Sequence, residues 1–129
     1  MKFPDDLKYT KSHEWVRPNG KAAVCGITDY AQHELSDVVY VELPDVGDEV
    51  KAGAQCAVVE SVKIAADVYA PISGKVTKIN MELDAAPETV NNDPYGAGWF
   101  FHVEMSDPAE LDALMDADEY KAHTEAEKD

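Results

Sequence analysis

A chain of 129 residues with 45% hydrophobic and 29% charged residues has the size and composition of one folded domain, which we take to span residues 1–129. Its net charge of −15 argues against nucleic-acid binding, because that function needs a basic surface. No run approaches the roughly 18 consecutive apolar residues of a membrane span, and residues 1–6 have the features of neither a signal peptide nor a transit sequence. We therefore expect a cytoplasmic monomer that works without a membrane.

Short apolar runs separated by turn residues predict strands along most of the chain. Residues 7–17 and 21–27 are predicted to form a hairpin whose turn is Pro18-Asn19-Gly20. Thr28 is a helix-capping residue and predicts a short helix that ends near residue 36. The further strands are expected over residues 38–43, 49–50, 56–62, 65–69, 75–79 and 99–104. This pattern predicts a mainly β fold, a flattened barrel or sandwich of two antiparallel sheets.

The end of the chain changes from strand to helix signals, so we expect a core over about residues 7–105 and C-terminal helices over about 107–126. Residues 107–110 form a capping box with proline at the first helical position. Three apolar residues then recur at helical spacing: Leu111, Leu114 and Met115. A second capping signal at residues 116–119 predicts another helix with Tyr120 on its inner face. The excess of acids in this segment fits a solvated surface and also steering toward basic partner enzymes.

Nothing in the sequence predicts a catalytic or metal centre. The histidines show no H-E-x-x-H spacing and the cysteines no C-x-x-C spacing. A phosphate-binding glycine loop and a nucleophile elbow are also missing from the sequence. Cys25 and Cys56 lie in apolar runs and are expected to be buried reduced thiols. We therefore expect a protein that is not an enzyme and has no catalytic residue and no metal.

Lys63 is the candidate functional residue. Strand alternation puts Val62 and Ile64 on one side and Lys63 on the other, so the two apolar side chains are expected to pin a hairpin tip to the core while the lysine protrudes. The small Ser61 leaves the ammonium accessible, and Glu60 supplies an acid near the tip. Acylation of one lysine among several needs a rigid, protruding amine of this kind.

Several motifs in a fixed order then give a specific resemblance. Glu60-Ser61-Val62-Lys63, followed by Gly74 eleven residues after the lysine, resembles the lipoyl-attachment signature. Over essentially the whole chain, the sequence resembles the H proteins of the glycine cleavage system. The other segments that carry this resemblance are residues 12–15, 26–32, 41–44, 90–95 and 98–99, together with the acidic C-terminal helices. The resemblance implies a lipoyl-domain-like fold.

The resemblance also implies a cofactor and partners. Lys63 would carry lipoate in amide linkage, attached by a lipoate ligase or a lipoyl or octanoyl transferase. The arm would take an aminomethyl group from glycine decarboxylase (the P protein, a pyridoxal-phosphate enzyme) and deliver its carbon to tetrahydrofolate on aminomethyltransferase (the T protein). Dihydrolipoyl dehydrogenase (the L protein) would then reoxidise the dithiol. The carrier would perform no chemistry itself.

This cycle predicts a sheltering cleft, because the loaded arm bears an ammonium group next to sulfur and decomposes in water. Carboxylates and a hydroxyl would hold that cation. Guided by the family resemblance, we select Ser12 and Glu14, expected on one face of the same strand, and Asp67, four residues past Lys63. Ile64 departs from the family pattern, which usually has a small residue after the lysine.

Other functions remain open at this point. The same scaffold could relay octanoyl or lipoyl groups to other proteins, and the sequence does not separate that role from glycine cleavage. A biotin carrier is disfavoured because Val62 and Ile64 stand where methionines normally flank the lysine. The lipoyl domain of a 2-oxoacid dehydrogenase would have aspartate before the lysine. A purely structural interaction module would make Lys63 dispensable.

Overall fold

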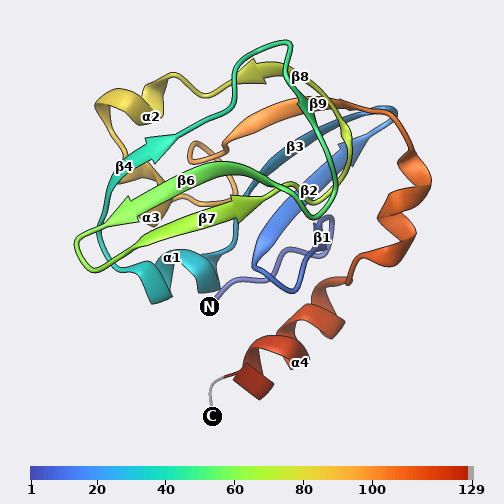
Figure 1. Cartoon of the computed structure of the whole chain (residues 1–129). Helices are drawn as coiled ribbons and strands as arrows, with labels where there is room; N and C mark the ends of the chain where they lie inside the picture. The colour runs from blue at the N-terminus through green and yellow to red at the C-terminus, as the bar shows by residue number, and fades with distance from the viewer. Residues whose placement is uncertain (128–129) are drawn as a thin grey trace.

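The structure, a computed structural model, describes residues 1–127 and contains two antiparallel sheets packed face to face (Figure 1). The larger sheet has the order β1 (Lys8–Tyr9), β2 (Glu14–Asn19), β3 (Ala22–Ile27), β9 (Phe101–Met105), β8 (Gly74–Ile79), β5 (Glu49–Val50). The smaller sheet has the order β4 (Val38–Glu42), β6 (Gln55–Ser61), β7 (Ala65–Tyr69). The predicted mainly β sandwich is therefore confirmed.

The main core lies between the two sheets. Val41, Val59 and Val68 come from the three strands of the smaller sheet and are at most 5% exposed. Cys25 and Phe101 face them from the larger sheet and are almost completely buried. Apolar and polar residues alternate along each strand, so the apolar side chains of both sheets point into the space between them.

Both cysteines are free thiols, as predicted from their apolar surroundings. Cys25 is buried as predicted, but Cys56 is only half-buried, so the prediction of full burial is wrong for Cys56. Burial raises the pKa of the Cys56 thiol to about 12 and also raises that of Cys25. Both groups are therefore protonated and poorly nucleophilic at neutral pH.

The predicted strand over residues 7–17 is wrong, because two strands and a tight turn occupy this segment. Lys8 pairs with Val16 and Tyr9 with Trp15, so the chain reverses through residues 10–13. His13 adopts a left-handed backbone conformation with φ of 74°, and its N–H donates to the carbonyl of Thr10 at 3.2 Å. The reversal uses neither glycine nor proline, so the sequence pattern does not reveal it.

The hairpin turn after β2 is shorter than predicted and lies further along the chain. Pro18 and Asn19 belong to β2, and Asn19 pairs with Ala22. The two-residue turn is Gly20-Lys21, with Gly20 at φ of 65°. A positive φ at the first turn position suits glycine, which explains the position of the turn.

Three short helices pack at one end of the sandwich. In α1 (Asp29–Leu35), the hydroxyl of Thr28 accepts from the N–H of Ala31 at 3.1 Å, which confirms the predicted cap. The connection from β8 to β9 contains two helices that the sequence analysis missed, α2 (Glu82–Ala85) and α3 (Thr89–Asn92). Each inserts one side chain into the core, Leu83 and Val90. Four-residue helices are too short to show a helical period.

The first predicted C-terminal helix is only a short 3₁₀-helix, η1 (Pro108–Ala113). Asp107 caps it by accepting from Ala109, but Glu110 does not close the expected capping box. Its carboxylate instead accepts from the backbone N–H and hydroxyl of Ser73 at 2.7 and 2.9 Å. Leu114 is extended and Met115 pairs with Tyr9, so the predicted apolar helical stripe is wrong.

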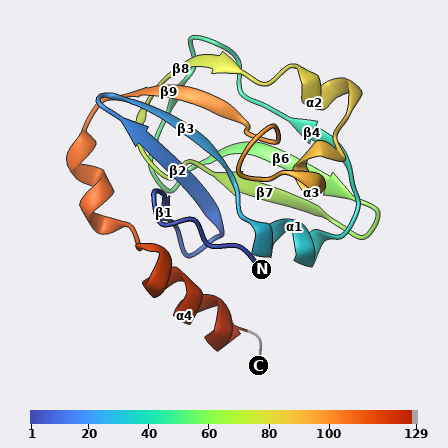
Figure 2. The ribbon, with the colours of Figure 1, turned by 180° about the vertical axis from the view of Figure 1, so that it is seen from behind.

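The second predicted helix is confirmed as α4 (Ala117–Glu127). Asp116 and Glu119 form a reciprocal capping box, each carboxylate accepting from the other residue's backbone N–H at 2.9 and 3.1 Å. Tyr120 is fully buried and stacks on Tyr9 with ring centroids 4.6 Å apart. Figure 2 shows α4 docked beside the N-terminal strands. None of the helices in the described part of the chain has the length and apolarity that crossing a membrane requires.

Candidate functional site

Lys63 lies in the tight turn between β6 and β7, and its side chain is exposed. The N–H of Ser61 donates to the carbonyl of Ile64 at 2.8 Å and closes the turn. The Ser61 hydroxyl accepts from the N–H groups of Lys63 and Ile64 at 3.1 and 3.2 Å. A further bond from the N–H of Val62 to the carbonyl of Asp37 ties the turn to the start of β4. The turn therefore holds the lysine backbone in one position.

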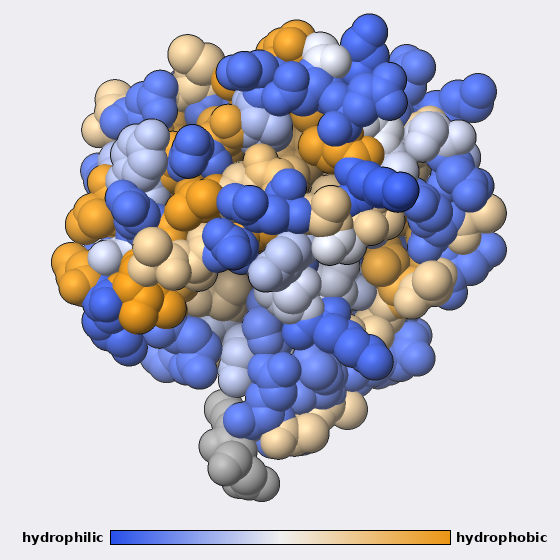
Figure 3. Space-filling view, viewed as in Figure 1, coloured by the Kyte–Doolittle hydropathy of each residue, from blue (hydrophilic) through white to orange (hydrophobic). Residues whose placement is uncertain are grey.

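The apolar residues beside Lys63 do not pin the turn to the core, so that prediction is wrong. Val62 is 63% exposed and Ile64 is 54% exposed. The strand ladder ends at Glu60 and Ala65, so the alternation assumed for residues 62–64 does not apply within the turn. Figure 3 shows apolar atoms at the left edge of the molecule, where Figure 1 places this turn. Lys63 thus stands among exposed aliphatic groups.

Glu60 and Gly74, the outer residues of the predicted attachment signature, occupy different environments. Glu60 is exposed at the end of β6 and, within residues 1–127, forms no ion pair with Lys63. Gly74 begins β8 in the other sheet, where an added Cβ would collide with the backbone oxygen of Glu104. The structure gives Gly74 a packing role between strands, and its place in the lipoyl-attachment signature stays a prediction.

Ser12, Glu14 and Asp67 line one cavity of about 420 Å³. Ser12 lies in the turn between β1 and β2, not on one strand with Glu14 as we expected. Ile64, from the lysine turn, lines the same cavity. The cleft and the turn therefore meet at Ile64, the residue that follows Lys63.

Glu14 is the buried acid of this cleft, with only 2% of its surface exposed. One carboxylate oxygen accepts from the hydroxyls of Ser12 at 2.5 Å and Thr10 at 2.6 Å. The other oxygen accepts from the backbone N–H of Tyr69 at 3.2 Å. Burial raises the pKa of the Glu14 carboxyl, and these hydrogen bonds oppose that rise. Within residues 1–127, Glu14 forms no ion pair, so its charge is solvated by neutral donors alone.

Sequence reasoning missed several groups of the cleft. Thr10 and the N–H of Tyr69 complete the donors around Glu14, and α1 and the last turn of α4 supply other walls. These walls include Tyr30 and Glu127, which come from distant parts of the chain. Only the docking of both helices brings them together, and no local sequence signal reports that contact.

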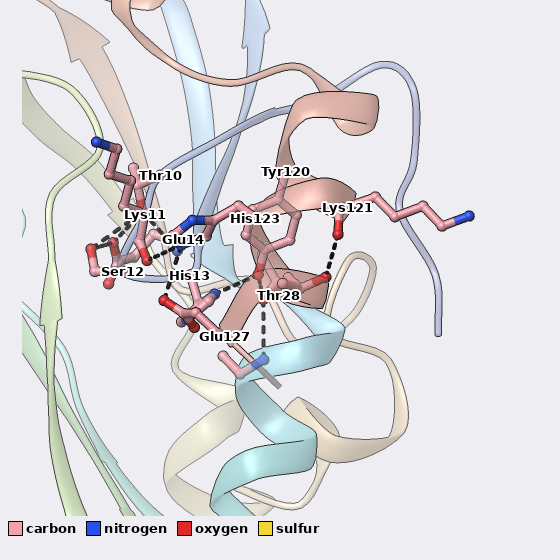
Figure 4. A network of polar contacts seen from close by, with 12 residues as sticks. Thr10, Lys11, Ser12, His13, Glu14, Thr28, Tyr120, Lys121, His123 and Glu127 are labelled. Carbon is pink, nitrogen blue, oxygen red and sulfur yellow. Dashed lines mark hydrogen bonds and ion pairs between the residues drawn. The ribbon is translucent and has the colours of Figure 1, made fainter. Parts of the chain in front are cut away.

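Figure 4 shows a polar network that joins α4 to the cleft. Nδ1 of His13 lies 2.8 Å from the hydroxyl of Tyr120, which lies 2.6 Å from the hydroxyl of Thr28. On its other side, Nε2 of His13 lies 2.8 Å from the Glu127 carboxylate. His123 reaches the same carboxylate at 3.1 Å. Burial lowers the pKa of His13, whereas Glu127 raises it.

Together, the fold and the site define a class of protein: a small β-sandwich carrier domain that presents one lysine on a rigid turn beside a cleft with a buried carboxylate. Comparison with known proteins gives the family. The family model described as "Glycine cleavage H-protein" matches residues 7–127. The chain therefore belongs to the glycine cleavage H-protein family, whose members are lipoyl carriers of the glycine cleavage system.

Individual relatives agree with this assignment. The glycine cleavage system H protein of Anaeromyxobacter sp. strain K is 57% identical over 128 residues, covering 99% of this chain and 100% of that protein. An H protein of Thermus thermophilus is 52% identical over 127 residues, 98% of this chain and 99% of that protein. A crystal structure of the H protein from Mycobacterium marinum superposes with a TM-score of 0.87 at 39% identity, covering 95% of this chain and 98% of that one.

Proposed function

We propose that Lys63 carries the lipoyl group in amide linkage to its Nζ atom. The observation that carries this proposal is the β6–β7 turn, in which Ser61 holds the backbone while the lysine side chain stays exposed. A modifying enzyme can reach such an amine without unfolding the domain. The attaching enzyme would be a lipoate ligase or a lipoyl or octanoyl transferase.

The loaded arm would then shuttle between the three enzymes of the glycine cleavage system. Glycine decarboxylase transfers the aminomethyl group to one sulfur of the arm with loss of carbon dioxide. Aminomethyltransferase passes the carbon to tetrahydrofolate and releases ammonia, and dihydrolipoyl dehydrogenase reoxidises the resulting dithiol with NAD. All bond-making groups in this cycle belong to the arm and the partner enzymes, so the carrier itself is non-catalytic.

The cleft would shelter the aminomethyl ammonium between visits. Glu14 supplies a buried negative charge that, within residues 1–127, has no cation paired with it, and Ser12 and Asp67 line the same cavity. An ammonium group entering this cavity gains a charge-assisted hydrogen bond where water competes little. Such a cleft favours glycine cleavage over a lipoyl-relay role, because a neutral octanoyl or lipoyl group makes no use of a buried carboxylate.

The test is glycine decarboxylation in a system reconstituted with the partner enzymes and lipoate ligase. Lys63→Arg keeps the charge but removes the acylatable amine, so we expect activity to disappear while the fold persists. Lys51→Arg, at another exposed lysine, serves as the matched control and should retain activity. Full activity of the Lys63→Arg carrier would refute the proposal. The cytoplasmic, monomeric state expected from the sequence stays a prediction.

A further inference from the structure

Three potential metal ligands converge where α4 meets the β1–β2 turn. They are His13, His123 and Glu127, and their ligand atoms all lie within 4.8 Å of one another. The two separations from Glu127, 2.8 Å to His13 and 3.1 Å to His123, are close to the spacing of about 3.3 Å between ligands of a tetrahedral zinc ion with bonds of about 2.0 Å. Small shifts of the side chains would therefore admit a cation.

Nδ1 of His13, the ring nitrogen that would not bind the metal, has a hydrogen-bond partner. The non-ligating nitrogen of a metal-binding histidine usually has such a partner. Nδ1 of His13 contacts the hydroxyl of the buried Tyr120, which contacts the hydroxyl of Thr28 (Figure 4). Both hydroxyls can rotate, so Nδ1 can donate its proton into this chain and leave the Nε2 lone pair for a metal. A partner on the opposite ring nitrogen fixes the tautomer and the ring orientation.

The backbone conformation of the β1–β2 turn and the helical spacing in α4 also bring the three ligands close to one another. His13 is held at φ of 74°, a conformation that non-glycine residues rarely adopt and that persists only where the surroundings enforce it. His123 and Glu127 are four residues apart and lie on one face of α4. The carboxylate of Glu34 adds negative charge near His13.

We propose that His13, His123 and Glu127 form a binding site for one divalent cation of the zinc class. Two imidazoles and one carboxylate suit such an ion, with the fourth position left to water. Binding replaces the contacts of His123 with Glu127 and with the carbonyl of Lys11, which lies 3.1 Å from Nε2. His13 and Glu127 also line the cleft, so the ion would fasten α4 at the cleft rim. Binding of the ion at this site does not require the lipoyl group.

The experiment is a zinc titration of the untagged, unlipoylated full chain after treatment with a chelator, followed by calorimetry and by thermal unfolding. We expect one saturable site and a rise in Tm with zinc. His123→Asn and Glu127→Gln should each weaken binding by about tenfold or more, since each removes a ligand. Neither side chain belongs to the buried core, since His123 is 23% and Glu127 40% exposed, so we expect both variants to fold.

Two control variants separate this site from other zinc ligands. His33→Asn, at a histidine outside the cluster, should bind zinc as the wild type does, and so should Cys56→Ser. Absence of a saturable site would overturn the proposal. So would binding that survives both His123→Asn and Glu127→Gln unchanged. Neither outcome would bear on Lys63, because the titration uses the unlipoylated chain.

Discussion

Glu14 combines a buried carboxyl group with neutral hydrogen-bond donors, and this environment makes its own titration contribute to the pH dependence of stability. Hydroxyls of Thr10 and Ser12 and one backbone N–H satisfy its oxygens, but desolvation still dominates and raises its pKa. The folded protein therefore holds this proton at higher pH than the unfolded chain, whose value is near 4.5. Stability is lost as the pH rises from that value through the folded pKa.

Glu14→Gln removes this titration. The stability of the variant relative to the wild type should increase as pH rises from about 4.5 through the folded pKa and level off above it. Urea unfolding of both proteins at a series of pH values across this range measures the difference. Glu49→Gln, at an exposed position, is the control and should show no such trend. A wild type that gains stability over the variant with rising pH would contradict the assigned environment of Glu14.

Ser61 organises the lysine turn through its side chain, so its hydroxyl should matter more for lipoylation than for stability. We expect Ser61→Ala to slow lipoylation by a lipoate ligase several-fold, because Lys63 and Ile64 lose a common acceptor. Loss of these exposed bonds should lower the free energy of unfolding by no more than about 1 kcal/mol. Initial lipoylation rates, with Ser106→Ala as the exposed control, check this prediction; equal rates for all three proteins would refute it.

At the scale of elements, the sequence predicts those features that depend on local patterns. The bounds of β7 and the Thr28 cap of α1 follow from alternation and capping chemistry, and the structure confirms both. The reversal at residues 10–13 lacks glycine and proline, and α2 and α3 are too short for a detectable period. The family resemblance predicts Ser12 and Glu14 as cleft residues, and they meet in a cleft whose remaining walls need α1 and α4 in place.

Gly74 lies where β8 approaches β9 closely. A substitution at this position can therefore show whether the glycine is needed for strand packing or for recognition by the lipoylating enzyme. Gly74→Ala places a methyl group against the backbone oxygen of Glu104, so the strands must shift. We expect a loss of about 1–3 kcal/mol in the free energy of unfolding. Folded Gly74→Ala protein should still accept lipoate at the wild-type rate, as measured by denaturant unfolding and ligase kinetics. A stable variant that is not lipoylated would instead assign Gly74 to enzyme recognition.

At the scale of the whole molecule, α4 depends on the N-terminal segment for its docking. A second core cluster joins Tyr120 to Leu7, Tyr9 and Trp15, apart from the core between the sheets. The Tyr120 hydroxyl adds the contacts to His13 and Thr28. The N-terminal strands and α4 thus pack onto each other beside the cleft, and Glu127 of α4 lies at its rim. Changes in this contact should therefore alter the cleft as well as the helix.

Tyr120→Phe removes the hydroxyl while keeping the ring stack. Because Thr28 and His13 lose a buried partner, we expect the free energy of unfolding to fall by about 1–3 kcal/mol. Amide hydrogen exchange should accelerate in α4 more than in the sandwich strands. Tyr40→Phe, at a tyrosine 49% exposed, is the matched control. Unchanged exchange in α4 of Tyr120→Phe would show that the hydroxyl does not secure the helix.

The attachment of lipoate to Lys63 is the central claim, and an intact-mass measurement tests it most directly. The chain is co-expressed with a lipoate ligase and supplied with lipoate, and its mass and peptide map are recorded with the Lys63→Arg variant in parallel. We predict a single increment equal to one lipoyl amide, located at Lys63 and lost in the variant. An unmodified chain, a biotinyl increment, or a lipoyl group on another lysine would contradict the claim.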